Sequence, residues 1–213
     1  VEGITEWLPI SSTGHMILLN EFVTLDVSPE FWNMFLVVIQ LGAILAVVVL
    51  YWKKLFPFNF SGGPFIKKHT FLMWFKIIVA CIPAAIVGIL FDEKLEELFY
   101  NYWVVSIALI VFGILFIVVE NVNRGKKARI RKLSQITYPV AIFIGLFQLI
   151  AAIFPGTSRS GATIVGGLIA GVSRSVSAEF TFFMAVPVML GASLLKVIQY
   201  GLSFTVMELV VLL

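Results

Sequence analysis

Long apolar runs, separated by short charged segments, constrain this 213-residue chain more than any other feature of its sequence. Hydrophobic residues make up 60% of the chain, charged residues only 13%, and the mean hydropathy is +1.04. Soluble domains of this length carry much less apolar surface. Several runs approach the ~20 residues that a helix needs to cross a bilayer. Because only helices and closed barrels satisfy their backbone in lipid, these runs predict an all-α, polytopic membrane protein.

Four of these runs have the length and composition of full membrane spans. By residue number they are 31–52, 71–91, 103–119 and 180–197, and 204–213 begins a further crossing. We expect a single membrane domain over 1–213, with one repeat over 1–119 and a second over 138–213. Val1 is not an initiator methionine and the sequence stops inside an apolar run, so both ends are expected to be cut.

The charged segments between the runs alternate in sign along the chain. Residues 21–30 and 92–97 are acidic, whereas 53–69 and 124–132 are basic. By the positive-inside rule, the basic loops are expected to face the cytoplasm and the acidic ones the outside. The net charge of +3 is small and the basic residues lie in loops, so the expected partner is the lipid bilayer and not a nucleic acid. Cys81 lies inside an apolar run and is expected to pack there.

Two segments are too polar or too short to be ordinary spans. Residues 1–20 contain glutamates, hydroxyl groups and a histidine, and are interrupted at Pro9 and Gly14. A second segment is interrupted at Pro155, and the helix expected after it, 162–172, reaches only about 16 Å, roughly half the hydrocarbon thickness. Both segments predict re-entrant helical hairpins that face protein or a water-filled cavity.

The two hairpins repeat one spacing pattern about Pro9 and Pro155. The matched positions are Glu2 with Gln148, seven residues before the prolines, Ser12 with Ser158, three after, and the prolines of the following spans, Pro83 with Pro187. Under the loop assignment, the first hairpin enters from outside and the second from the cytoplasm, so the pattern predicts inverted-topology repeats. Chance similarity between two Ser/Gly/Pro turns is the alternative.

The second turn, FPGTSRSGAT over 154–163, combines small residues, hydroxyl groups and a cation. Gly156 allows close approach of backbone N–H groups, and Arg159 supplies a planar, permanent positive charge. The hydroxyl groups come from Ser158, Ser160 and Thr163. These groups suit a phosphate or diphosphate ligand. Because a charged arginine is costly at membrane depth, a functional role is favoured over an interfacial turn with a snorkelling side chain.

The first turn brings two acids and a hydroxyl cluster together. Glu2 and Glu6 are four residues apart, so on a helix they share a face. Two like charges at such a site need a divalent cation, Arg159 or a raised pKa. Mg²⁺ and Ca²⁺ take oxygen ligands and bridge carboxylates to phosphate. The alternative is an interfacial helix with two solvated acids.

His15 follows this hydroxyl cluster, which consists of Ser11, Ser12 and Thr13. An imidazole there can act as general acid or base, or as a phosphoryl-accepting nucleophile, whereas His69 in a basic loop is expected to be an ordinary histidine. Together the two turns hold the groups for phosphoryl transfer. No Walker glycine–lysine motif is present, so hydrolysis of a phosphorylated lipid is favoured over nucleotide-driven transport. This interpretation requires Glu6 and Arg159 to share one pocket.

Two motifs, EGITEWLPISSTGH over 2–15 and PGTSRSGAT over 155–163, resemble the signatures of the bacterial undecaprenyl-diphosphate phosphatase family, the bacitracin-resistance family. The resemblance covers essentially the whole chain. It implies hydrolysis of undecaprenyl diphosphate, a polyprenyl diphosphate lipid, to the monophosphate, which recycles the carrier for peptidoglycan and other envelope polymers and confers bacitracin resistance. It also implies a divalent cation and an active site open to the outer side of the bacterial cytoplasmic (inner) membrane. A homodimer is left open as the form of assembly.

By motif, Glu2 and Glu6 match the family's acidic pair, which implies metal binding, with Glu6 the more critical. Glu6, Ser12, His15 and Arg159 are the catalytic residues implied by the resemblance, and the nucleophile is either His15 or Ser12. The residues implied in substrate binding are Ser11, Thr13, Gly156, Ser158, Ser160 and Thr163.

Three other classes of protein compete with this interpretation. A transporter or lipid flippase also shows inverted repeats with broken helices, but does not require Glu2, Glu6, His15 and Arg159 to converge. The other membrane lipid-phosphatase superfamily needs a histidine downstream of its arginine, and none follows Arg159. A structural membrane subunit leaves acids and an arginine at helix breaks unexplained.

Overall fold

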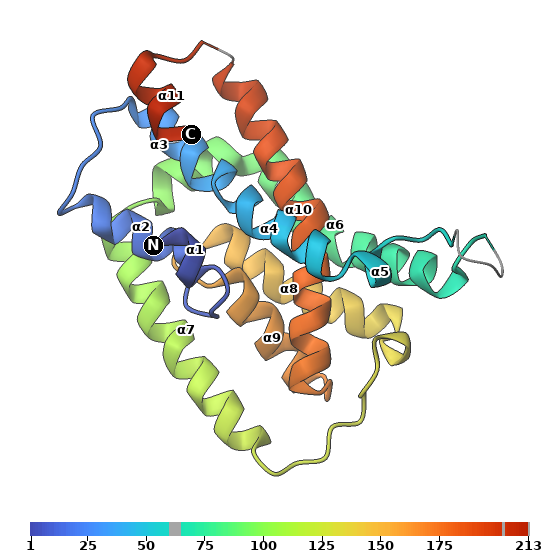
Figure 1. Ribbon diagram of the computed structural model, residues 1–213. Helices are drawn as coiled ribbons and strands as arrows, with labels where there is room; N and C mark the ends of the chain where they lie inside the picture. The colour runs from blue at the N-terminus through green and yellow to red at the C-terminus, as the bar shows by residue number, and fades with distance from the viewer. Residues whose placement is uncertain (60–64, 202, 213) are drawn as a thin grey trace.

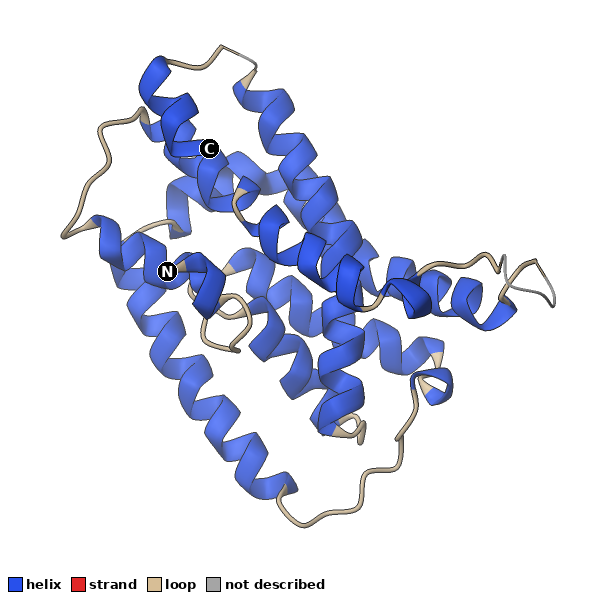
Figure 2. Cartoon of the chain, in the orientation of Figure 1, coloured by secondary structure: helices blue, strands red, loops and turns tan. Residues whose placement is uncertain are grey.

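Helices joined by loops make up the computed structural model, which describes residues 1–59, 65–201 and 203–212 (Figures 1 and 2). Over the described residues, the only β contacts are two isolated bridges, Phe58–Ile66 and Ile130–Val172. The elements are α1 (Glu2–Thr5), α2 (Ser12–Asn20), α3 (Pro29–Val38), α4 (Gln40–Leu50), α5 (Trp52–Leu55), α6 (Lys68–Phe99), α7 (Tyr102–Asn123), the 3₁₀ turn η1 (Leu133–Gln135), α8 (Tyr138–Ile153), α9 (Arg159–Ile169), α10 (Arg174–Tyr200) and α11 (Val206–Leu212). The predicted all-α class is confirmed for this part of the chain.

Four helical segments in the described residues are long and apolar enough to cross a membrane: Pro29–Leu50, which contains α3 and α4, and the helices α6, α7 and α10. These match the four predicted spans, so the prediction of a multi-pass membrane protein is confirmed. Helix α7 presents a row of exposed isoleucines, as a lipid-facing helix does: Ile107, Ile110, Ile114 and Ile117.

Some predicted boundaries are wrong. The acidic segment 92–97 is not a loop but the last turns of α6, which runs for 32 residues. Its leucine, lysine and glutamates are strong helix formers, and Lys196 of α10 pairs with two of its acids. The further crossing predicted at 204–213 contains only the seven-residue α11, and its last residue lies outside the described part.

The predicted interruption near Pro9 is confirmed, because α1 ends at Thr5 and α2 begins at Ser12. The predicted break at Gly14 is wrong, because Gly14 lies within α2. A side chain there would place its Cβ 3.0 Å from the Cα of Gly156. Glycine is needed at position 14 for a close contact between two segments, not for a turn.

Helices α8 and α9 lie between α7 and α10 in the centre of the molecule (Figure 1). Both ends of this pair meet the basic segment 124–132. The N–H groups of Arg129 and Ile130 donate to the carbonyl oxygen of Gly171, just after α9, and Ser173 N–H donates to Ile130 O at 2.8 Å. The same segment leads through η1 into α8. The α8–α9 pair therefore starts and finishes beside one loop.

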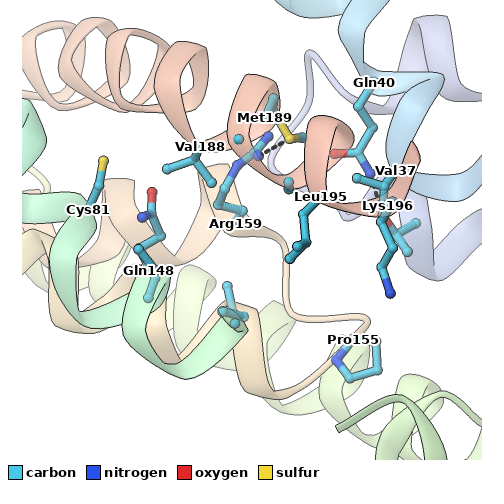
Figure 3. Close-up of a pocket in the computed structure, with 18 of the residues that line it drawn as sticks. Val37, Gln40, Cys81, Gln148, Pro155, Arg159, Val188, Met189, Leu195 and Lys196 are labelled. Atoms are coloured by element: carbon cyan, nitrogen blue, oxygen red, sulfur yellow. Dashed lines mark hydrogen bonds between the residues drawn. The ribbon is translucent and has the colours of Figure 1, made fainter. Parts of the chain in front are cut away.

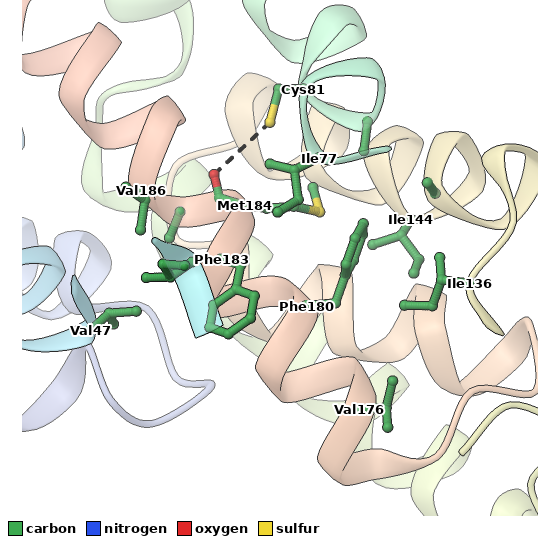
Figure 4. Packing of buried hydrophobic residues seen from close by; sticks show 14 of the residues in the cluster. Val47, Ile77, Cys81, Ile136, Ile144, Val176, Phe180, Phe183, Met184 and Val186 are labelled. Carbon is green, nitrogen blue, oxygen red and sulfur yellow. Dashed lines mark hydrogen bonds between the residues drawn. The ribbon is translucent and has the colours of Figure 1, made fainter. Parts of the chain in front are cut away.

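A buried core centred on α10 holds the helices around the α8–α9 pair (Figure 4). Phe180 and Phe183 of α10 are fully buried with Ile77 of α6 and Ile144 of α8. Cys81 is buried in the same core, as predicted. A second core joins α3 to α7 and α2 through Phe31, Met34, Leu36, Val105 and Ile17. These two cores fix the elements that carry the predicted site residues.

Candidate active site

The two motif turns touch each other through their glycines. Besides the contact of Gly14 with Gly156, a Cβ on Gly161 would lie 3.1 Å from the carbonyl oxygen of Pro9. Gly156 has φ +92° and sits against the backbone of α7, where a Cβ would lie 2.6 Å from Val105 O. Because glycine has no side chain, the backbones can come into direct contact at these positions. Gly14 and Gly161 thus allow the two motifs to contact each other, and Gly156 allows the second turn to contact α7.

Each turn leads into a helix whose first residues are capped by a serine. Ser11 accepts a hydrogen bond from Gly14 N at 3.2 Å at the start of α2, and Ser158 accepts one from Gly161 N at 3.1 Å at the start of α9. Ser11 has φ +65°, an uncommon conformation for a residue with a side chain. Both capping serines line the same cavity. Two helix N-termini thus bring partial positive charge to one place, which favours an anionic ligand.

An ion pair joins the turns at this place. Arg159 Nη2 lies 2.6 Å from Glu6 Oε1, and the two side chains are only 18% and 14% exposed. Ser12 Oγ donates a hydrogen bond to the other carboxylate oxygen of Glu6 at 2.5 Å. Figure 3 shows the guanidinium of Arg159 reaching toward Met189 of α10. The predicted convergence of Glu6 and Arg159 is confirmed.

The cavity between the turns has a volume of about 670 Å³ and a polar and an apolar part. The polar part contains Glu6, Ser12, Arg159 and the predicted binding residues Ser11, Thr13, Gly156, Ser158 and Ser160. The apolar part is formed by α6 and α10, and includes Ile78, Ile82, Ile89, Leu194 and Ile198, all of which are also exposed on the outside of the protein. The cavity therefore links a charged site to the lipid-facing surface.

Three predicted site residues, all described, do not line this cavity: Glu2, His15 and Thr163. Thr163 Oγ1 donates to the carbonyl oxygen of Arg159 at 2.9 Å. His15 Nδ1 lies 2.7 Å from the carbonyl oxygen of Ser11. The side chains of Thr163 and His15 thus contact the backbone of the turns and support their shape.

Glu2 is buried, and neither carboxylate oxygen has a hydrogen-bond partner among the described residues. It lies outside the four spans. Burial, and after it the nearby Glu6 carboxylate, raise the pKa of Glu2 to about 7. A buried carboxylate without a partner fits a hard cation, which takes oxygen ligands. The described residues contain no group of three or more His, Cys, Asp or Glu placed to hold a metal.

Comparison with known proteins identifies the family. The family described as "Bacitracin resistance protein BacA" matches residues 1–213. The chain belongs to this family. A Desulfitobacterium hafniense protein named "Undecaprenyl-diphosphatase" is 67% identical over 213 residues, covering 100% of this chain and 77% of the relative. A Clostridium acetobutylicum protein named "Undecaprenyl-diphosphatase 1" is 66% identical over 212 residues, with the same coverage. An Enterococcus faecalis protein named "Undecaprenyl-diphosphatase" is 58% identical over 214 residues, again covering 100% and 77%.

A second ionic cluster in this BacA-family chain was missed by sequence reasoning. Lys196 Nζ lies 2.7 Å from Asp92 Oδ2 and also pairs with Glu96, joining α10 to α6. Asn33 of α3 donates to the other oxygen of Glu96 at 3.4 Å. Lys196 and Asp92 line the same cavity as Arg159. The available signal was a lysine inside a predicted span, which at membrane depth calls for a partner.

Gln148 and Thr157 were also not predicted as site residues. Both are buried and line the cavity, and each has a side-chain polar atom with no hydrogen-bond partner among the residues that the structure describes: Nε2 of Gln148 and Oγ1 of Thr157. The repeat pattern named Gln148 only as the counterpart of Glu2. Thr157 belongs to the second motif, whereas Gln148 lies outside both motifs and is brought into the cavity wall by the packing of α8.

Proposed function

We propose that this chain is a membrane phosphatase that hydrolyses undecaprenyl diphosphate to undecaprenyl phosphate and inorganic phosphate. The observation that carries the proposal is the Glu6–Arg159 ion pair, which joins two glycine-rich turns where two helix N-termini reach a common cavity. The names of the relatives from three organisms support the substrate. The reaction recycles the lipid carrier for cell-wall synthesis, and the family description supports a role in bacitracin resistance.

The shape of the cavity supports a substrate with a charged headgroup and an apolar tail. The headgroup lies at the turns, where Arg159 and the N-termini of α2 and α9 provide positive charge. The isoprenoid tail lies between α6 and α10, against residues such as Ile89 and Leu194 that also face the lipid. At Gly88 and Gly191 a Cβ would meet no atom of the described residues within 4 Å, so these glycines leave open space along the tail's path.

In this proposal Ser12 is the nucleophile, because its Oγ lies in the cavity wall and donates to Glu6, whereas His15 is outside the wall. Ser12 Oγ attacks the terminal phosphorus and gives its proton to Glu6. The bond from that phosphorus to the bridging oxygen breaks, and the departing undecaprenyl phosphate takes the proton from Glu6.

Water then attacks the phosphoserine and gives a proton to Glu6. The phosphorus–Oγ bond breaks, inorganic phosphate leaves, and Ser12 recovers its proton from Glu6. Arg159 and the helix N-termini stabilise the negative charge on the phosphoryl oxygens in both steps.

A divalent cation, Mg²⁺ or Ca²⁺, is part of the proposal, with Glu2 and Glu6 as its protein ligands. The partnerless, buried carboxylate of Glu2 supports it. When bound, such an ion neutralises charge on the diphosphate oxygens.

The proposed topology has two re-entrant hairpins, α1–α2 and α8–α9, in inverted repeats. In support, α9 has only 11 residues, and both ends of the α8–α9 pair meet the basic segment 124–132. The basic segments lie in the cytoplasm, so the active site opens to the outer side of the bacterial inner membrane. The proposal includes a homodimer, which is tested by the mass of the protein in its detergent complex.

Phosphate release by the purified protein in detergent tests the proposed function, because no second compartment exists there for a transporter to fill. We expect release from undecaprenyl diphosphate that a chelator abolishes, that added Mg²⁺ or Ca²⁺ restores, and that Glu6→Gln lowers by at least about 10²-fold. If wild-type protein releases no phosphate from undecaprenyl diphosphate when the cation is present, the proposal is contradicted. A trapped phosphoenzyme that survives acid and is lost in base identifies phosphoserine, whereas the opposite stability identifies phosphohistidine.

A further inference from the structure

Three cavity-lining residues carry buried polar atoms that no described group satisfies: Arg159 Nε, Thr157 Oγ1 and Gln148 Nε2. Of the three, Gln148 alone lies outside the two motifs, and only 2% of its surface is exposed. Buried donors are almost always paired, because leaving one unpaired costs most of its hydration free energy. Three such atoms in one wall therefore indicate a ligand with several hydrogen-bond acceptors.

The packing of α8 against α6 determines where Gln148 lies. A Cβ on Gly145 would lie 2.1 Å from Ala80 O, so the two helices touch through their backbones one turn before Gln148. Figure 3 shows the Gln148 amide in the cavity wall near Cys81, from a different helix than Arg159. Gln148 precedes the last residue of α8, Ile153, by five positions, which is about 7.5 Å along the helix.

Another glutamine in the same wall shows how the chain satisfies a buried amide when it is structural. Gln40 is also buried, but its Nε2 donates to Leu36 O at 2.8 Å and to Thr13 Oγ1 at 3.0 Å. Among the described residues, the amide nitrogen of Gln148 has no such oxygen acceptor, and its side chain faces only the thiol of Cys81, which is a weak acceptor. The difference separates a glutamine that holds the wall together from one whose donor is free for a ligand.

We propose that Gln148 is a substrate-binding residue whose Nε2 donates a hydrogen bond to a phosphate oxygen of the lipid diphosphate. The inference rests on the proposed function. A diphosphate offers more oxygens than Arg159 alone can reach, and Gln148 contacts it from α8 while Arg159 contacts it from α9. A neutral amide adds this hydrogen bond without placing a second cation at membrane depth.

The Gln148→Met variant tests the inference, because methionine has similar length and no donor. We expect its KM for undecaprenyl diphosphate to rise about tenfold with kcat within about twofold of wild type. Its Tm is expected to be unchanged or higher, because an unpaired buried donor is removed. A purely structural glutamine gives the opposite pattern, a lower Tm and a wild-type KM. The isosteric Gln148→Glu, which has an acceptor in place of the donor, is expected to raise KM further.

Gln199→Met is the matched control, because Gln199 is an exposed glutamine of α10 that does not line the cavity. Both the KM and the Tm of this variant are expected to stay at wild-type values.

A second measurement does not depend on turnover. Inorganic pyrophosphate, with Mg²⁺ present, is expected to raise the Tm of wild type, and Gln148→Met to need about tenfold more of it for the same rise.

The outcomes separate the two proposals. Wild-type protein that releases no phosphate contradicts the proposed function, and the pyrophosphate measurement still decides the role of Gln148. Gln148→Met and Gln148→Glu with wild-type KM and wild-type protection by pyrophosphate contradict this inference alone.

Discussion

Two ionic clusters line the same cavity, and they differ in how completely their charges are satisfied. In one, Lys196 of α10 is paired with both Asp92 and Glu96 of α6, near the C-terminal ends of two long helices. In the other, Arg159 pairs with the single carboxylate of Glu6 at the start of a short helix, and its Nε has no partner in the described part of the chain.

The difference indicates what each cluster does. A cation held by two carboxylates has little positive charge left for a ligand, so the Lys196 cluster ties α6 to α10. Arg159 has only one counter-charge and lies beside two helix N-termini. Its positive charge and its unpaired N–H group therefore remain available to bind an anion. Changes in the first cluster should therefore affect stability, and changes in the second should affect catalysis.

The largest expected effect comes from Ser12→Ala. Because this variant lacks the proposed nucleophile, we expect kcat to fall by at least about 10³-fold, with the Tm in detergent close to that of wild type. Phosphate release and trapping of the phosphoenzyme measure the result. A Ser12→Ala enzyme that still forms a phosphoenzyme shows that the nucleophile is another residue.

Arg159→Lys should follow, with kcat/KM lower by about 10²–10³-fold. Lysine keeps the charge that Glu6 needs but loses the planar fork that binds phosphate oxygens in pairs. Arg174→Lys is the matched control, because Arg174 pairs with Glu120 at 3.0 Å on the surface and its side chain is 64% exposed. Near-normal phosphate release by Arg159→Lys would contradict the assignment of the Glu6–Arg159 cluster to catalysis.

Lys196→Met should produce the opposite pattern. We expect the free energy of unfolding to fall by about 2 kcal/mol, because Asp92 and Glu96 lose their common partner in a poorly solvated place. Activity per folded molecule should stay within about fivefold of wild type. Thermal unfolding in detergent measures the first quantity, and Lys196→Arg, which keeps the charge, should recover most of the loss. A variant with normal stability but no activity places Lys196 in the catalytic cluster instead.

His15→Gln should lower kcat/KM by about tenfold, which corresponds to about 1.4 kcal/mol and is the smallest of these effects in free energy. His15 acts here through the carbonyl group of Ser11, whose backbone is in a strained conformation. Since the imidazole transfers no proton in the proposed mechanism, the shape of the pH–rate profile should not change. Loss of one limb of that profile would make His15 a general acid or base.

Sequence reasoning predicted the long helices well and the ends of elements poorly. The four spans followed from apolar length alone, because lipid leaves the chain no other way to satisfy its backbone. The charges of segment 92–97 predict a loop, but the segment is helical and Lys196, about 100 residues later in the chain, pairs with its acids. Gly14 was interpreted as a break, although its lack of a side chain serves a contact with Gly156.

For the candidate site, the residue types in the two motifs were enough to predict that Glu6 and Arg159 meet, since each needs an opposite charge at membrane depth. Motifs could not reveal which of their members line the cavity. His15, Thr163 and Glu2 do not line the cavity, whereas Gln148, from outside both motifs, does.

The sequence by itself determined the class of the protein, the family and the two polar turns, because hydropathy and local motifs depend only on neighbours along the chain. Only the tertiary structure decided which side chains share the cavity and which polar atoms are left without partners. Those properties arise where helices far apart in the chain come together, as α6 and α8 do around Gly145, and no short stretch of residues contains that information.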